Sequence, residues 1–329
     1  MVERPDLNSM FTSLTFILEH SNNTIKKSSL DACVVAKQIA VQNNLTFNAV
    51  LIGNTGIDII PLNKMGIDRL FHLVPKDYVE QTPFGARNGI IKVLADKQLN
   101  LIASAHTAFN SELAGYLSIA KDADIITNCF DVHINENSIS ASRHVFAGRF
   151  KETLQTSKSN VILTLRATKG EIPHYENKMQ YEQHIIESSA EKCKIIETKH
   201  FDKIVDIADA NILIVGGKGM QSAANFNLLE ELASLLNASV GASRDVVDAG
   251  WRPQYEQVGQ TGKTVSPAIY VACGVSGAVQ HIAGMRNSRI IIAINKDETA
   301  PIFRVAHYGI IGDAIEVLPR LIKELRNNL

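Results

Sequence analysis

The sequence predicts an α/β protein made of two α/β domains, the C-terminal one built on a doubly wound parallel sheet. Short apolar runs alternate with helical patterns up to residue 128, and the alternation restarts at Ala210. A length of 329 residues is enough for about two hydrophobic cores. We expect the domains to span residues 1–203 and 204–329.

In the N-terminal domain, strands and helices are expected to alternate without interruption at first. This pattern is typical of a parallel sheet with helices on both faces. Ser28, Ser29 or Asp31 is available to cap the first helix. The expected strands are 13–18, 47–52, 70–74, 99–104 and 124–128, and the expected helices are 30–41, 84–94 and 108–119.

The pattern then changes. Residues 138–150 and 161–167 predict two strands with no helix between them, so we expect antiparallel additions to the same sheet. Residues 168–194 are polar, and we expect them to be irregular.

The C-terminal domain begins with a continuous apolar run, 211–215, which is typical of a strand buried on both faces. The other expected strands are 238–242, 268–272, 290–294 and 303–308, and the expected helices are 223–236, 276–285 and 313–325.

The charge balance gives no reason to expect nucleic acid or an anionic membrane as a partner, because Lys plus Arg is 33 and Asp plus Glu is 34. No apolar run reaches the roughly 20 residues of a membrane span. The four cysteines are scattered, which favours a reducing compartment without disulfides, and no metal site is expected. The N-terminus has neither a signal nor a transit pattern, so we expect a bacterial cytoplasm, with the mitochondrial matrix as the alternative.

Glycine, serine, asparagine or charged residues follow all five expected strands of the C-terminal domain. In an open parallel sheet, ligands bind outside the carboxyl ends of the strands, so this edge predicts a nucleotide site. The segments concerned are 216–220, 241–244, 274–277, 295–297 and 309–313.

The first segment begins the dinucleotide fingerprint with Gly217-x-Gly219 but has Ser222 in place of the third glycine. Glycines let a phosphate approach backbone N–H groups. A tight turn without a ligand explains the same pattern equally well.

The second segment disfavours NAD, which requires an acidic residue here. Ser243 and Arg244 stand there, and Asp245 is available to cap the next turn. The Arg244 cation suits an anionic group, although a surface ion pair is the simpler interpretation. The polar loop 251–266 contains apolar packing residues and is expected to form a wall of the site.

The third segment, 276–281, opens an expected helix directly after a buried strand, so its N–H groups can receive an anion. His281 lies in its second turn. A lone helical histidine is more often a packing residue, but the neighbouring strand ends favour a place in the site.

Six linked segments between Ala210 and Asp313 closely resemble the electron transfer flavoprotein alpha subunit. The N-terminal domain resembles the family only loosely, through its α/β pattern and Ala147-Gly148. The six segments are Val215-Gly-Gly-Lys-Gly219, Val240-Gly-Ala-Ser-Arg244, Gln257-Val-Gly-Gln-Thr-Gly262, Gly274-Val-Ser-Gly-Ala-Val-Gln-His281, Ala293-Ile-Asn-Lys-Asp297 and Ala300-Pro-Ile-Phe303.

The resemblance implies an FAD-binding C-terminal domain, an N-terminal domain that contacts a separate beta subunit, and AMP in that subunit rather than in this chain. It implies that Arg244 lies beside the flavin ring, Thr261 near N5 and His281 near O2, and that these three tune the flavin. Lys218 stands where the family commonly has arginine. The FAD-binding residues implied are Lys218, Ser243, Arg244, Val258, Gly259, Gln260, Thr261, Ser276, Gly277, Ala278, Val279, Gln280, His281, Asn295, Asp313 and Ala314.

The function implied is electron shuttling without turnover of a substrate, so no catalytic residue is expected. Dehydrogenases such as the acyl-CoA dehydrogenases of fatty acid β-oxidation would reduce the FAD, and a membrane quinone oxidoreductase would accept the electrons. Two alternatives stay open: an NAD-dependent dehydrogenase, and a binding protein that kept the fold and lost the flavin. An ordinary carrier and an electron-bifurcating relative are not distinguished.

Overall fold

The computed structural model divides the chain into two compact units, Met1–His200 and Phe201–Leu329, which are described separately. The boundary expected between residues 203 and 204 lies outside the described residues, as do Ala147-Gly148 and Cys193. The structure describes residues 10–76, 82–94, 100–146, 150–166, 175, 178–187, 206–208 and 210–328.

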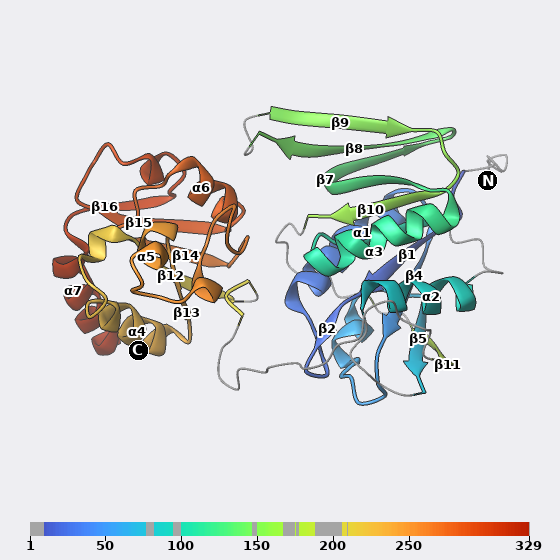
Figure 1. The fold of residues 1–329 in the computed structure, drawn as a ribbon, viewed down its shortest axis with the longest axis horizontal. Helices are drawn as coiled ribbons and strands as arrows, with labels where there is room; N and C mark the ends of the chain where they lie inside the picture. The colour runs from blue at the N-terminus through green and yellow to red at the C-terminus, as the bar shows by residue number, and fades with distance from the viewer. Residues whose placement is uncertain are drawn as a thin grey trace, which may run out of the picture. The chain divides into compact units, whose positions relative to one another are not determined.

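A nine-stranded sheet forms the centre of the N-terminal unit (Figure 1). The first seven strands in spatial order are parallel, and the last two are antiparallel additions. The order is β11 (Gln180–Ile186), β5 (Arg69–Pro75), β4 (Thr46–Ile52), β1 (Ser13–Leu18), β6 (Leu101–Ala105), β10 (Val161–Leu165), β7 (Asp124–Asn135), β8 (Ser138–Val145) and β9 (Phe150–Thr156).

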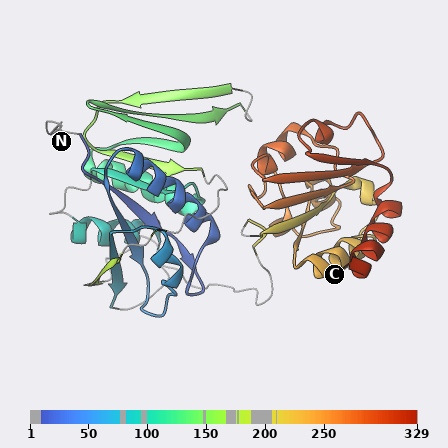
Figure 2. The same ribbon diagram turned by 180° about the vertical axis from the view of Figure 1, so that it is seen from behind.

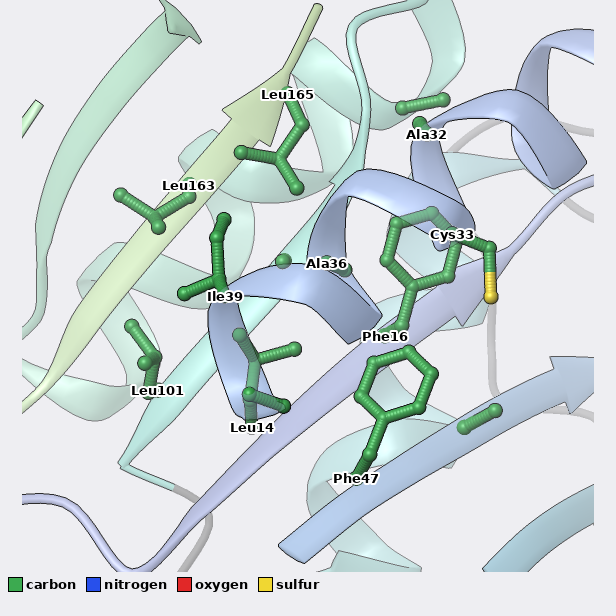
Figure 3. Packing of buried hydrophobic residues seen from close by; sticks show 14 of the residues in the cluster. Leu14, Phe16, Ala32, Cys33, Ala36, Ile39, Phe47, Leu101, Leu163 and Leu165 are labelled. Atoms are coloured by element: carbon green, nitrogen blue, oxygen red, sulfur yellow. The ribbon is translucent and has the colours of Figure 1, made fainter. Parts of the chain in front are cut away.

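Helices cover both faces of this sheet. One face packs against α1 (Lys27–Gln42), whose small residues let the helix approach the strands closely, as Figure 3 shows. The other face packs against α2 (Pro83–Leu94) and α3 (Ala108–Lys121). A small hairpin, β2 (His20–Ser21) and β3 (Thr24–Ile25), and the 3-10 turn η1 (Ile60–Lys64) lie between the main elements.

Three expectations for this unit are wrong. The run 138–150 is not one strand: it contains all of β8 and the first residue of β9, because the chain turns back after Val145. The run 161–167 is not antiparallel: β10 lies between β6 and β7, parallel to both, and its five residues are all buried. Residues 168–194 are not irregular throughout, since β11 is a polar edge strand beside β5.

The first helix also differs in its cap, because its N-cap residue is Lys26, which makes no side-chain capping bond. Ser29 instead accepts a hydrogen bond from the backbone N–H of Glu19 at 3.0 Å. The expected cap therefore serves the turn after β1.

A buried carboxylate fills the switch point of the N-terminal sheet, where the chain leaves β1 for β4 on one side and β6 lies on the other. Glu19 follows β1 and is 8% exposed. Its Oε2 accepts hydrogen bonds from Thr107 Oγ1 at 2.7 Å and Asn110 Nδ2 at 3.1 Å, both at the start of α3. Lys26 pairs with the other oxygen. The chain's own anion thus occupies the helix N-terminus that ligands use in many doubly wound sheets.

The C-terminal unit has a five-stranded, fully parallel sheet with helices on both faces (Figures 1 and 2). Buried side chains pack on each face. α4 (Phe226–Leu236), α5 (Arg244–Asp248) and α7 (Ala314–Asn328) pack on one face. α6 (Val279–Met285) packs on the other. The strand order is β13 (Ser239–Ala242), β12 (Ile212–Gly216), β14 (Ile269–Cys273), β15 (Ile290–Asn295) and β16 (Tyr308–Ile311). This confirms the doubly wound parallel sheet.

Two expectations for the C-terminal unit are wrong. The helix expected at Ser276 begins at Val279, because Gly277 has φ +82°, which no α-helix accommodates. The strand expected over 303–308 is instead the end of a 3-10 turn, η4 (Pro301–Arg304), followed by a loop and then β16. Within the described part of the chain, no helix combines the length and apolar character needed to cross a bilayer.

Candidate functional site: the carboxyl edge of the C-terminal sheet

The turns after β12 and β14 pack against each other through backbone atoms. The N–H of Gly217 donates to Cys273 O, and that of Gly219 donates to Gly274 O, both at 2.9 Å. A Cβ at Gly217 would lie 2.2 Å from the Gly274 carbonyl oxygen, and one at Gly219 would lie 2.6 Å from Gly274 Cα. These glycines are therefore required by contact between two turns, with or without a ligand.

The first turn departs from the dinucleotide fingerprint in structure as well as in sequence. The glycines are followed by a 3-10 turn, η2 (Lys218–Met220), and α4 begins only at Phe226. A helix N-terminus does not directly follow the glycines, as the NAD-type fingerprint requires. This geometry disfavours an NAD site of the usual kind.

Lys218 and Arg244 are cations at the first and second strand ends of this edge. Lys218 is exposed, and its Nζ lies 4.2 Å from the centroid of the Trp251 ring, a cation–π contact between the first turn and the 251–266 loop. Arg244 is 65% exposed, and its Nε lies 3.2 Å from Asp248 Oδ2. The ion pair considered for Arg244 therefore exists, but at that exposure it leaves the guanidinium accessible to an anion.

Hydrogen bonds join the remaining strand ends into one surface. The N–H of Ser243 donates to Gly216 O at 2.9 Å, linking the second edge to the first. Asn295 Nδ2 donates to Val275 O at 2.9 Å, linking the fourth to the third. Asp313 accepts a hydrogen bond from Gln221 Nε2 at 3.1 Å, and its other carboxylate oxygen caps α7.

The segment 257–262 is fixed to the second edge and to α6. The N–H of Val258 donates to Ala242 O at 2.9 Å, and that of Gln260 donates to Gln280 O at 2.9 Å. Gly259 has φ +144°. Thr261 is exposed, and its Oγ1 accepts a hydrogen bond from the Gln257 side chain at 3.0 Å. The chain thus presents an exposed hydroxyl on a well-fixed loop.

The segment from Ser276 into the first turn of α6 lies mostly at the surface. Ser276, Ala278, Val279 and Gln280 are exposed. Gly277 is buried, because a Cβ there would lie 2.4 Å from the backbone nitrogen of Ile302. The structure therefore brings the expected site residues of this segment to the same edge as the others, except for the side chain of His281.

His281 lies below that surface. Its side chain is 6% exposed, and Nε2 lies 2.8 Å from the Tyr270 hydroxyl. Nδ1 is buried and has no well-formed hydrogen bond. Burial lowers the pKa of His281 to about 4, against the opposing influence of the Val258 carbonyl and Asp245. The imidazole is therefore neutral near pH 7 in the unliganded chain, so it does not act there as a cation.

The low pKa of His281 predicts a loss of stability in acid. An unfolded histidine binds a proton near pH 6.5, whereas the folded one does so only near pH 4. Because the unfolded state binds more protons between these values, the free energy of unfolding falls as the pH drops through this window, by about 3 kcal/mol from this residue. Urea unfolding of the nucleotide-free chain at pH 7 and pH 4.5 should show a smaller difference in His281→Gln than in wild type. If the free energy of unfolding differed between the two pH values by the same amount in both proteins, the buried imidazole of His281 would not be neutral.

Sequence reasoning missed one residue of this site. Tyr270 lies within the strand expected over 268–272 and was not considered as a site residue. A tyrosine hydroxyl in a fully buried strand needs a polar partner. That need was the signal available in the sequence, but the partner's position was not.

Comparison with known proteins identifies the family. The profile described as "Electron transfer flavoprotein domain" matches residues 14–190, and the one described as "Electron transfer flavoprotein FAD-binding domain" matches residues 206–286. Protein FixB of Clostridium saccharobutylicum is 33% identical over 315 residues, covering 94% of each chain. The chain belongs to the electron transfer flavoprotein alpha-subunit family.

Other relatives agree with this assignment. The electron transfer flavoprotein subunit alpha of Bacillus subtilis is 34% identical over 237 residues, covering 71% of this chain and 73% of its own. The mitochondrial subunit alpha of Oryza sativa is 58% identical over 120 residues, or 36% of this chain and 34% of its own. The family is that of the electron transfer flavoproteins, and its FAD-binding domain matches residues 206–286, which lie within the C-terminal unit. An alpha subunit implies a heterodimer with a beta subunit.

Proposed function

We propose that this chain binds FAD at the carboxyl edge of its C-terminal sheet and carries electrons without a substrate turnover of its own. Dehydrogenases such as the acyl-CoA dehydrogenases of fatty acid β-oxidation are the donors, and a membrane quinone oxidoreductase is the acceptor. The observation that carries this proposal is that five strand ends and the 257–262 loop are joined into one surface by hydrogen bonds.

The residues present fit a dinucleotide. Lys218 and Arg244 are exposed cations that can face a diphosphate or a reduced ring. Thr261 is exposed and offers a hydroxyl, and four residues of the 276–280 segment, all but Gly277, are exposed. When bound, FAD supplies the redox chemistry, and the protein supplies orientation and electrostatics. We propose that it is held by Lys218, Ser243, Arg244, Val258, Gly259, Gln260, Thr261, Ser276, Gly277, Ala278, Val279, Gln280, His281, Asn295, Asp313 and Ala314.

Arg244→Ala is expected to make the midpoint potential of the bound FAD more negative. The guanidinium is the permanent cation at the second strand end, and a positive charge stabilises the negative charge that a flavin gains on reduction. Arg244→Lys should retain part of the effect. Spectroelectrochemical titration measures the potential, and a value identical to wild type in Arg244→Ala would remove Arg244 from the tuning residues.

The N-terminal unit is proposed to contact the beta subunit, and AMP is proposed to bind in that subunit. In this chain, Glu19 already fills the switch point of the N-terminal sheet with an anion, which disfavours AMP at that place. We place the protein in a bacterial cytoplasm, with a mitochondrial matrix as the alternative.

Electron transfer tests the proposed donors and acceptor directly. The FAD-loaded heterodimer is mixed with an acyl-CoA dehydrogenase and its substrate, and then with a quinone oxidoreductase. Bleaching of the flavin absorbance by the first and recovery with the second are expected. If NADH bleaches the flavin and the dehydrogenase does not, the donor class is wrong and a nicotinamide-linked or bifurcating carrier is favoured.

A further inference from the structure

Tyr270 and His281 form a buried polar pair beneath the proposed flavin site. Tyr270 is fully buried in β14, where it pairs with Leu213 of β12 and Ile291 of β15 in the middle of the sheet. Its hydroxyl lies 2.8 Å from Nε2 of His281, and the two rings meet edge to face. A central strand therefore fixes the position of the phenol, and the phenol contacts one particular nitrogen of the imidazole.

Both partners are neutral near pH 7. Burial raises the pKa of Tyr270 well above its usual value and lowers that of His281 to about 4. Tyr270 therefore keeps its phenolic proton, and His281 carries one proton on its ring. The hydrogen bond between Oη and Nε2 is made by one of these two protons.

The surroundings decide which partner donates. Among the described residues, His281 is the partner found for the Tyr270 hydroxyl. If Nε2 carried the proton and donated, the phenolic O–H would be buried without an acceptor, which is costly. If the phenol donates, Oη and Nε2 are both paired, and the imidazole proton is on Nδ1, which is then the one group of the pair without a well-formed hydrogen bond. The other tautomer would leave both the phenolic O–H and Nδ1 unpaired.

We propose that Tyr270 is a positioning residue of the flavin site: its hydroxyl donates to Nε2 of His281 and holds the imidazole in the tautomer that is protonated at Nδ1. This inference rests on the proposed function. It makes His281 a neutral donor of fixed orientation rather than a cation.

The proton on Nδ1 has an electrostatic effect on the neighbouring loop. The Val258 carbonyl favours a proton on the ring, and Val258 opens the 258–261 segment that is proposed to reach the flavin. That segment is held against α6, since a Cβ at Gly284 would lie 2.5 Å from Gly259 Cα. A fixed tautomer directs the positive end of the imidazole dipole away from Tyr270. We expect this to favour the negative charge gained on reduction.

The test uses the heterodimer with ¹⁵N-histidine in this chain only, with and without FAD. The His281 ring signals are assigned by their loss in His281→Asn. Wild type should show Nδ1 protonated and Nε2 unprotonated. In Tyr270→Phe, which removes only the hydroxyl, the proton should redistribute between the two nitrogens, and the FAD midpoint potential should become more negative. Tyr308→Phe, a change on an exposed residue of β16, is the matched control and should alter neither.

A second pair of variants tests the position of the proton. The amide of His281→Asn places a donor where Nδ1 stands, whereas that of His281→Gln places it where Nε2 stands. The potential of His281→Asn should lie closer to wild type.

A wild-type His281 protonated at Nε2 would overturn the inference, even if Tyr270→Phe fails to fold. A Tyr270→Phe heterodimer with the wild-type tautomer and potential would also overturn it. A colourless wild-type heterodimer would instead contradict the proposed function, and the tautomer of the flavin-free complex would still decide this inference.

Discussion

Gly217→Ala is expected to destabilise the C-terminal unit by about 3 kcal/mol or more and to abolish FAD binding. The added Cβ would lie 2.2 Å from the Gly274 carbonyl oxygen and 2.7 Å from Val275 Cα. Both are backbone atoms, so the overlap can be relieved only by separating the turns after β12 and β14. Urea unfolding of the full-length chain, followed by the fluorescence of Trp251, measures the change. Trp251 is the chain's single tryptophan and lies beside this turn.

Gly115→Ala is the matched control, because a Cβ at Gly115 in α3 meets nothing within 4 Å. Alanine in a helix is expected to be neutral or stabilising by up to about 1 kcal/mol. If Gly217→Ala were as stable as this control, the contact between the two turns would not be what requires glycine.

Glu19→Ala is expected to destabilise the N-terminal unit by about 2–4 kcal/mol. The substitution removes the acceptor of Thr107 and Asn110 and leaves Lys26 without its partner. The lower part of this range allows for Lys26, which is 33% exposed and keeps part of its hydration. Urea unfolding of the full-length chain, followed by circular dichroism, measures the loss.

Lys76→Ala controls for the loss of an ion pair as such. Lys76 and Glu187 are 3.4 Å apart and are 61% and 70% exposed, so their separation should cost less than about 1 kcal/mol. Equal effects of the two substitutions would show that burial of Glu19 does not matter to stability.

Sequence periodicity predicted the alternating elements because long apolar runs and helical spacings are local signals. It misplaced β10 because adjacency in a sheet is not local: β10 follows β9 in the chain but lies between β6 and β7. The run Val161–Leu165 is apolar on both sides, which favours a central parallel strand, and that signal was available. β11 had no such signal, because it is a polar edge strand whose partner β5 lies about 110 residues earlier.

The strand ends of the C-terminal domain could be predicted as one surface because parallel strands share a carboxyl edge. The environment of each side chain could not be predicted from the sequence. The helix start at Val279 rather than Ser276 depends on contact between Gly277 and Ile302, which are distant in sequence. The neutral state of His281 depends on its burial, and its contact with Tyr270 depends on the fold; neither follows from helical spacing.

The visible spectrum of the complex decides whether this chain is an FAD-carrying alpha subunit. Co-expression with the beta subunit should give a yellow heterodimer that releases one FAD per pair on denaturation. Gly217→Ala in the same complex should lack the flavin absorbance. A wild-type heterodimer that stays colourless after incubation with added FAD would contradict the account.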